Sequence, residues 1–212
     1  MIVLAIDTCG ATGSIALGRI EQNMVETLAQ VELAGKTYSA QLVPSLREIL
    51  NQQGLTAGAL AAIVVVNGPG SFTGVRIGVS SAKGLAEALG IPLVAVSRLA
   101  VLAWKAGTGR AAIDAGRGEF YFRDHDREYL LCAKDLPILG QGREQGTIAV
   151  FEARAQQVFP SAQFVEAPTA EDALQYAMPR LLAHDFADVE TIDGNYVRRS
   201  DAEIFAKAAG KA

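Results

Sequence analysis

The chain has 212 residues, of which half are hydrophobic, and its 19 basic and 23 acidic residues give a formal net charge of -4 at pH 7. This composition excludes an intrinsically disordered chain and a broadly basic surface for nucleic acid. The length is sufficient for one large domain or two small ones with a substantial core.

The cellular compartment is indicated by what the sequence lacks. Cys9 and Cys132 are too few and too far apart for a disulfide framework, which favours a reducing cytosol. The opening MIVLAIDT reaches an acidic residue at Asp7 without a basic segment before it, unlike a signal peptide. No apolar run approaches the roughly 20 residues that cross a bilayer. We therefore expect a soluble cytoplasmic protein with no membrane partner.

The beginning of the chain predicts a sheet. Residues 2–6 form a continuous apolar run, as expected of a strand buried on both faces, and the run ends at Asp7. Residues 14–18 and 24–32 are predicted as two further strands, joined by short turns. Two successive hairpins therefore give an antiparallel start of three strands.

Residues 36–53 carry one apolar stripe at helical spacing, formed by Tyr38, Leu42, Leu46, Ile49 and Leu50. Pro44 lies inside this pattern, so the helix either starts close to it or is kinked there. Gly54 supplies a stop. The next elements are predicted as a strand over 62–66, a long helix over 71–89, a strand over 93–97 and a helix over 99–105. The order β-β-β-α-β-α-β is that of a ribonuclease H-like lobe.

A second lobe is predicted from a repeat of the first strand. AAIDA, which ends in Asp114 and Ala115, has the pattern of LAIDT at the start of the chain. A hairpin over 119–123 and 128–133 follows, then strands over 147–152 and 163–166, and a helix over 170–183 that Pro179 interrupts. We expect an α/β chain with a first lobe over 1–106 and a smaller one over 107–212, whose last helix is free to pack back on the first.

The glycine-rich turn NGPGSFTG at residues 67–74 has two interpretations. Gly68, Gly70 and Ser71, ahead of a helix N-terminus, could cradle a phosphate. Alternatively, the glycines only allow the helix to pack close to the sheet. The spacing fails the Walker pattern, because Val75 and Arg76 follow the last glycine, and it misses the dinucleotide fingerprint by one residue.

The helix over 71–89 is apolar over much of its circumference. Gly74, Gly78 and Ala82 drift along one side beside Val75 and Val79. We expect this helix, together with the one from Tyr38 to Leu50, to form a helical interface with a partner protein. A charge at Gly78 should then disrupt association.

Two carboxylates end equivalent strands. Asp7 and Asp114 could hold a magnesium-bound phosphate between the lobes, as paired strand-end carboxylates do in sugar kinases. Equally, each could accept hydrogen bonds from its own turn. A late glycine-rich adenosine clamp is missing, because only Gly194 and Gly210 follow Gly146. An ATP-dependent phosphotransferase is therefore the alternative rather than the leading function.

Other catalytic motifs are weak. His125 and His184 are far apart and form no metal-ligand pair, and Ser80 to Lys83 matches S-x-x-K only in the middle of a helix. We expect no catalytic residue, no metal and no cofactor, and a peptidase is disfavoured.

The chain resembles the TsaB family, formerly called YeaZ. The resemblance rests on LAIDT, NGPGSFTGVRIG followed by AKGLA, IDAGRGEFYF and NYVRRSDAEI, which are spread over nearly the whole chain. It implies two lobes of the actin-like ATPase, ribonuclease H-like superfamily. It also implies a non-catalytic subunit for N6-threonylcarbamoyladenosine formation at position 37 of ANN-decoding tRNAs.

The resemblance further implies the partners. Such a subunit binds TsaD, which carries the metal, the nucleotide and the transfer chemistry, and works with the ATPase TsaE. It meets tRNA only through the complex and forms homodimers when alone. The implied partner surface is built from the two first-lobe helices and comprises Tyr38, Leu42, Leu46, Val75, Arg76, Gly78, Val79, Ala82 and Lys83. Tyr38 stands where TsaB sequences often have histidine. Arg198 and Arg199 belong to a charged tail that either contacts tRNA phosphates or a partner, or is solvated.

Overall fold

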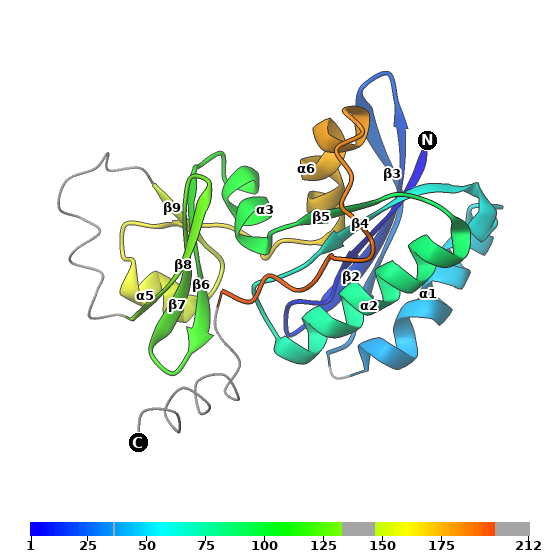
Figure 1. Cartoon of the computed structure of the whole chain (residues 1–212). Coiled ribbons are helices and arrows are strands. Elements are labelled where there is room, and N and C mark those ends of the chain that lie inside the picture. Colours follow the sequence, from blue (N-terminus) through cyan, green and yellow to red (C-terminus); the bar gives the residue numbers. More distant parts are fainter. Residues whose placement is uncertain (36, 133–146, 198–212) are drawn as a thin grey trace.

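The computed structural model describes residues 1–35, 37–132 and 147–197, so Arg198 and Arg199 lie outside the described residues. Two five-stranded sheets form two lobes, connected by helix α3 and by the returning C-terminal part of the chain (Figure 1). The predicted two-lobed α/β class is confirmed.

The first sheet is centred on β1 (Ile2–Asp7). β1 pairs antiparallel with β2 and parallel with β4, in the order β3-β2-β1-β4-β5. Val3 to Ile6 are fully buried, because helices cover both faces of the sheet. The other strands are β2 (Gly13–Glu21), β3 (Met24–Leu33), β4 (Leu60–Val66) and β5 (Leu93–Val96), with a 3₁₀ turn η1 (Ala57–Ala59) before β4.

Helices α1 (Tyr38–Gln52) and α2 (Phe72–Leu89) cover one face of this sheet (Figure 1). The whole predicted apolar stripe of α1 is buried, and the helix continues through Pro44. Ser71 caps the start of α2, where its Oγ accepts the Gly74 N–H at 3.2 Å, and Gly90 caps its end in the left-handed conformation.

The small residues of α2 face the sheet. A Cβ at Gly74 would collide with the carbonyl oxygen of Thr8, and one at Gly78 with the Thr8 hydroxyl. The Thr8 hydroxyl donates to the Gly74 carbonyl oxygen at 2.7 Å. Gly74 and Gly78 therefore allow close packing between helix and strand. The expectation that Gly78 presents a partner surface is wrong, because it faces Thr8.

The second sheet repeats the first. Its order, β8-β7-β6-β9-β10, matches β3-β2-β1-β4-β5 strand for strand, with the same parallel and antiparallel pairs. Its last two strands and helix α5 are short, which makes this lobe the smaller one. The elements are β6 (Arg110–Gly116), β7 (Glu119–Asp124), β8 (Arg127–Cys132), β9 (Ile148–Val150), α5 (Ala153–Val158) and β10 (Gln163–Phe164).

Two helices pack on the sheet of the other lobe. α3 (Arg98–Lys105) follows β5, yet Leu99 and Leu102 pack in one core with Ile113 of β6. α6 (Ala170–Leu182) follows β10, yet its buried side chains join the core of the first lobe. α6 runs through Pro179 without interruption, contrary to expectation. A 2.8 Å ion pair between Lys105 and Asp172 connects the two helices.

The segment over 183–197, called the strap below, runs back along α2 (Figure 1). Lys83 Nζ donates to the carbonyl oxygens of Glu190 and Ile192, each at 3.1 Å. The Asn195 N–H donates to the Asn67 carbonyl oxygen at 2.6 Å, and its side chain donates to Glu128 of β8, also at 2.6 Å. The strap therefore connects the first lobe to the second.

We predict that Gly74→Ala lowers the free energy of unfolding by about 1 to 3 kcal/mol, because the new methyl group meets backbone that cannot rotate away. Gly84→Ala is the matched control. It lies on the exposed side of the same helix with no atom near its Cβ position, so it should stabilise by up to about 1 kcal/mol. Urea unfolding of both variants checks this, and equal effects would contradict the packing assignment.

Candidate functional site

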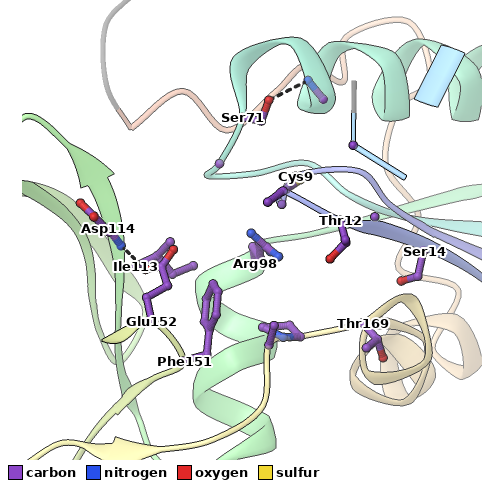
Figure 2. A pocket seen from close by; sticks show the side chains of 18 of the residues that line it. Cys9, Thr12, Ser14, Ser71, Arg98, Ile113, Asp114, Phe151, Glu152 and Thr169 are labelled. Carbon is purple, nitrogen blue, oxygen red and sulfur yellow. Dashed lines mark hydrogen bonds between the residues drawn. The ribbon is translucent and has the colours of Figure 1, made fainter. Parts of the chain in front are cut away.

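A cleft of about 1260 Å³ lies between the two lobes. Its walls come from the turn after β1, the start of α2, the turn after β6, and the segments around Glu152 and Thr169 (Figure 2). The corresponding carboxyl ends of β1 and β6 thus face one space, and this is the candidate site.

Asp7 is buried beside the cleft and is already bonded within the protein. Its Oδ1 accepts the Cys9 N–H at 2.8 Å, and its Oδ2 lies 3.5 Å from Arg98 Nε. Both side chains of this ion pair are almost completely buried. A buried carboxylate needs such partners, because desolvation of an isolated charge is costly.

Asp114 has an equivalent arrangement in the second lobe. Its Oδ1 accepts the Gly116 N–H at 2.8 Å, and its Oδ2 lies 3.1 Å from the Arg154 guanidinium. Each aspartate therefore accepts a backbone bond two residues ahead and has an arginine partner. Of the two alternatives for Asp7 and Asp114, the structure bears out the hydrogen bonds from their own turns.

The glycine-rich turn packs on the turn that follows β1. The Ser71 N–H donates to the Cys9 carbonyl oxygen at 2.8 Å, and a Cβ at Gly70 would collide with that same carbonyl group. Gly68 precedes Pro69 through a cis peptide bond and lies against Asn195 of the strap. Gly70 and Ser71 line the cleft, whereas Gly68 is not among its lining residues.

Arg98 is the site residue that sequence reasoning missed. It is 4% exposed and projects toward the cleft from the first residue of α3 (Figure 2). Its Nε makes no hydrogen bond, and its guanidinium carbon lies 5.2 Å from the centre of the Phe151 ring. The available sequence signal was an arginine directly after the helix-capping Ser97, where a positive charge is unfavourable for the helix dipole.

Glu152 is a second missed residue. Its Oε2 accepts the Asp114 N–H at 2.5 Å. Burial raises the pKa of this carboxyl, and the bond from Asp114 only partly opposes that effect. Burial likewise raises the pKa of the Cys9 thiol well above its ordinary value, and the neighbouring Asp7 charge adds to the shift. Cys9 is therefore held as a thiol that donates to the Val66 carbonyl oxygen.

The nine residues expected at a partner surface are placed differently from the expectation. Seven of them are buried in the core of the first lobe, because the sheet and not a partner covers their side of each helix. Tyr38 also forms part of the cleft wall, where its hydroxyl donates to the Gly10 carbonyl oxygen at 2.9 Å. Lys83 is bound to the strap, and Arg76 is exposed. The seven buried residues are Tyr38, Leu42, Leu46, Val75, Gly78, Val79 and Ala82.

The described residues contain no cluster of three or more His, Cys, Asp or Glu side chains suited to a metal ion. Across residues 1–35, 37–132 and 147–197, none of the helices is long and apolar enough to span a membrane.

The duplicated sheets, the exchanged helices and the cleft between them define a two-lobed protein of the actin-like ATPase, ribonuclease H-like class. Known proteins agree. A YeaZ structure from Pseudomonas aeruginosa is 27% identical with a TM-score of 0.74, covering 92% of this chain and 99% of that one. A second structure from that organism, described as similar to peptidase YEAZ, is 28% identical with a TM-score of 0.75, covering 93% and 99%.

The sequence comparisons define the family. The family model TsaD, described as tRNA N6-adenosine threonylcarbamoyltransferase, matches residues 26–142. The TsaB proteins of Escherichia coli (strain K12) and Bacillus subtilis (strain 168) are 38% and 41% identical, over 60% and 57% of this chain. The matched region spans about half the length of those relatives, 56% and 53%. The chain belongs to the TsaD family and, within it, to the TsaB, or YeaZ, proteins.

We predict that the free energy of unfolding of Glu152→Gln, measured relative to that of the unsubstituted protein, increases as pH rises from about 4 to about 7. A raised native pKa means that the folded state binds the proton more tightly than the unfolded state. The contribution of this carboxyl is therefore fully present below its unfolded pKa and is lost as pH rises through its native pKa. The amide cannot ionise and escapes that loss.

Urea unfolding at several pH values measures the difference between the two proteins. Glu166→Gln, which removes an exposed carboxylate on the same side of the cleft, is the control. A difference that stays constant with pH for Glu152→Gln would contradict the burial assigned to this carboxyl.

Proposed function

We propose that the chain is a non-catalytic subunit that binds a TsaD-like paralogue and, with a TsaE-like ATPase, supports N6-threonylcarbamoyladenosine formation at position 37 of ANN-decoding tRNAs. Its curated relatives carry the name tRNA threonylcarbamoyladenosine biosynthesis protein TsaB, which supports the pathway. In this proposal tRNA, ATP and metal are bound by the partner subunits, and the chain acts in the cytoplasm.

One observation carries the non-catalytic role. The two strand-end aspartates, which a phosphotransferase would use for a magnesium-bound phosphate, are each engaged by a turn N–H and an arginine. Asp7 is only 1% exposed as well. A carboxylate that neutralises an adjacent buried guanidinium is not free to take a metal without leaving that guanidinium uncompensated.

The docking surface for the TsaD-like paralogue is the outward side of α1 and α2. Val43 and Phe72 are 48% and 44% exposed on these helices. The Arg76 guanidinium carbon lies 3.8 Å from the centre of the Phe72 ring, and Tyr196 of the strap lies 5.6 Å from the same ring, between centres. Exposed aromatic and arginine side chains are the residue types that dominate binding energy at protein interfaces. The same surface would join two copies in the homodimer.

Reconstitution tests the proposed function. tRNA modification by the TsaD-like and TsaE-like components should fall strongly when this chain is omitted and return when it is added back. Modification that is unchanged by the omission would refute the proposal.

Calorimetry with Mg-ATP separates the alternative. The phosphotransferase hypothesis expects binding by the isolated chain that is lost in Asp7→Ala, whereas the subunit hypothesis expects weak binding or none.

We predict that Arg76→Glu weakens binding of the TsaD-like paralogue about tenfold or more, because it removes the cation above Phe72 and reverses its charge. Arg127→Glu is the matched control, with the same charge change at an exposed position on β8 of the other lobe. Surface plasmon resonance measures both affinities. Equal losses in the two variants would contradict the proposed surface.

A further inference from the structure

The charges that line the interlobe cleft do not suit a polyanion. Its described lining residues include the acids Glu32, Asp114, Glu152 and Glu166 and a single basic side chain, Arg98, while Asp114 has its ion-pair partner, Arg154, outside the lining. A bare phosphate chain would meet several carboxylates for each cation, and Coulomb repulsion in a partly enclosed space is poorly screened. A ligand that carries one positive and one negative group, and is neutral overall, leaves the net charge of the cleft unchanged.

Arg98 supplies a receptor for the negative group. A guanidinium has five N–H donors in a fork that matches a carboxylate. Its side chain makes no hydrogen bond to any described residue, and the 3.5 Å approach of Nε to Asp7 lacks hydrogen-bond geometry. The guanidinium is 95% buried, and its Nη donors, which no described residue takes, lie at the cleft and are able to bind an acceptor from outside the chain.

Gly10 in the β1–β2 turn gives the Arg98 guanidinium its place at the edge of the cleft. A Cβ at Gly10 would lie 2.6 Å from Arg98 Nη2, so the bare backbone there lets the guanidinium lie against the cleft wall. Figure 2 shows Arg98 between the Cys9 and Thr12 side and the Phe151 and Glu152 side.

Glu152 supplies a receptor for a positive group. Only the Asp114 N–H bonds to its carboxylate among the described residues, and none of their cations lies within ion-pair distance. Asp114, in contrast, is already paired with Arg154. Arg98 and Glu152 are thus an incompletely bonded cation and an unpaired anion that line one cavity.

The rest of the wall is suited to an apolar body. Ile77, Ile113, Tyr121 and Phe151 line the cleft, and about 1260 Å³ exceeds what a small ion needs. We propose that the cleft binds an amino acid with an apolar or aromatic side chain, its α-carboxylate on Arg98 and its α-ammonium on Glu152. This site is separate from the docking surface on α1 and α2, and it does not depend on the proposed function.

Titration calorimetry of the isolated chain with L-phenylalanine tests the site. The two analogues that each lack one charge, hydrocinnamate without the ammonium and L-phenylalaninamide without the carboxylate, should bind about tenfold more weakly or worse. Equal binding of hydrocinnamate and L-phenylalanine would overturn the role of Glu152. Absence of L-phenylalanine binding at millimolar concentration would overturn the proposal.

Substitutions locate the binding. Arg98→Met should abolish it, and Glu152→Gln should weaken it about tenfold or more, while Glu87→Gln, which removes an exposed carboxylate outside the cleft, leaves it unchanged. Circular dichroism reports whether Arg98→Met folds, and if it does not, Glu152→Gln and the two analogues decide. Binding of L-phenylalanine that survives Glu152→Gln unchanged would overturn the assignment. Because no partner is present in the assay, failure here leaves the proposed function untouched.

Discussion

The contact between Thr8 and the two glycines of α2 is the constraint on which the first lobe depends. Thr8 follows the central strand, and its carbonyl oxygen and hydroxyl occupy the space that side chains at Gly74 and Gly78 would need. The close approach fixes the start of α2, and with it the Ser71 bond to the Cys9 carbonyl oxygen. The glycine-rich turn and the turn after β1 are consequently one packed unit, and this unit is one wall of the cleft.

The second lobe repeats the strand order of the first, but the lobes are not independent bodies. α3 packs on the second sheet and α6 on the first, so each lobe completes its core with a helix from the other half of the chain. Glu128 adds a polar connection, because it accepts bonds from Ser97 at 2.5 Å, Asn195 at 2.6 Å and Arg123 at 2.9 Å. The exchanged helices and this carboxylate together hold the two walls of the cleft in position relative to each other.

Much of the fold could be predicted from the sequence. Continuous apolar runs predicted the strands that are buried on both faces, and the spacing of apolar residues predicted the buried side of α1. The repeat of LAIDT in AAIDA correctly indicated duplication. The short α5 was missed, since six residues give too little periodicity, and Pro179 was read as a break although α6 continues past it. The site was less predictable: Asp7 and Asp114 were found, but their arginine partners were not, because Arg98 and Arg154 are 91 and 40 positions away from them.

The sequence by itself determined the class, the duplicated order of strands and helices, the family resemblance and the positions of the two strand-end aspartates, because these depend on local pattern and spacing. Only the tertiary structure decided which side of each helix is covered. An apolar stripe has the same period whether it faces its own sheet or a partner, and the sheet covers seven of the nine residues assigned to a partner. The tertiary structure also decided which charged side chains pair, because an ion pair depends on distance in space and its two residues need no particular spacing in the sequence.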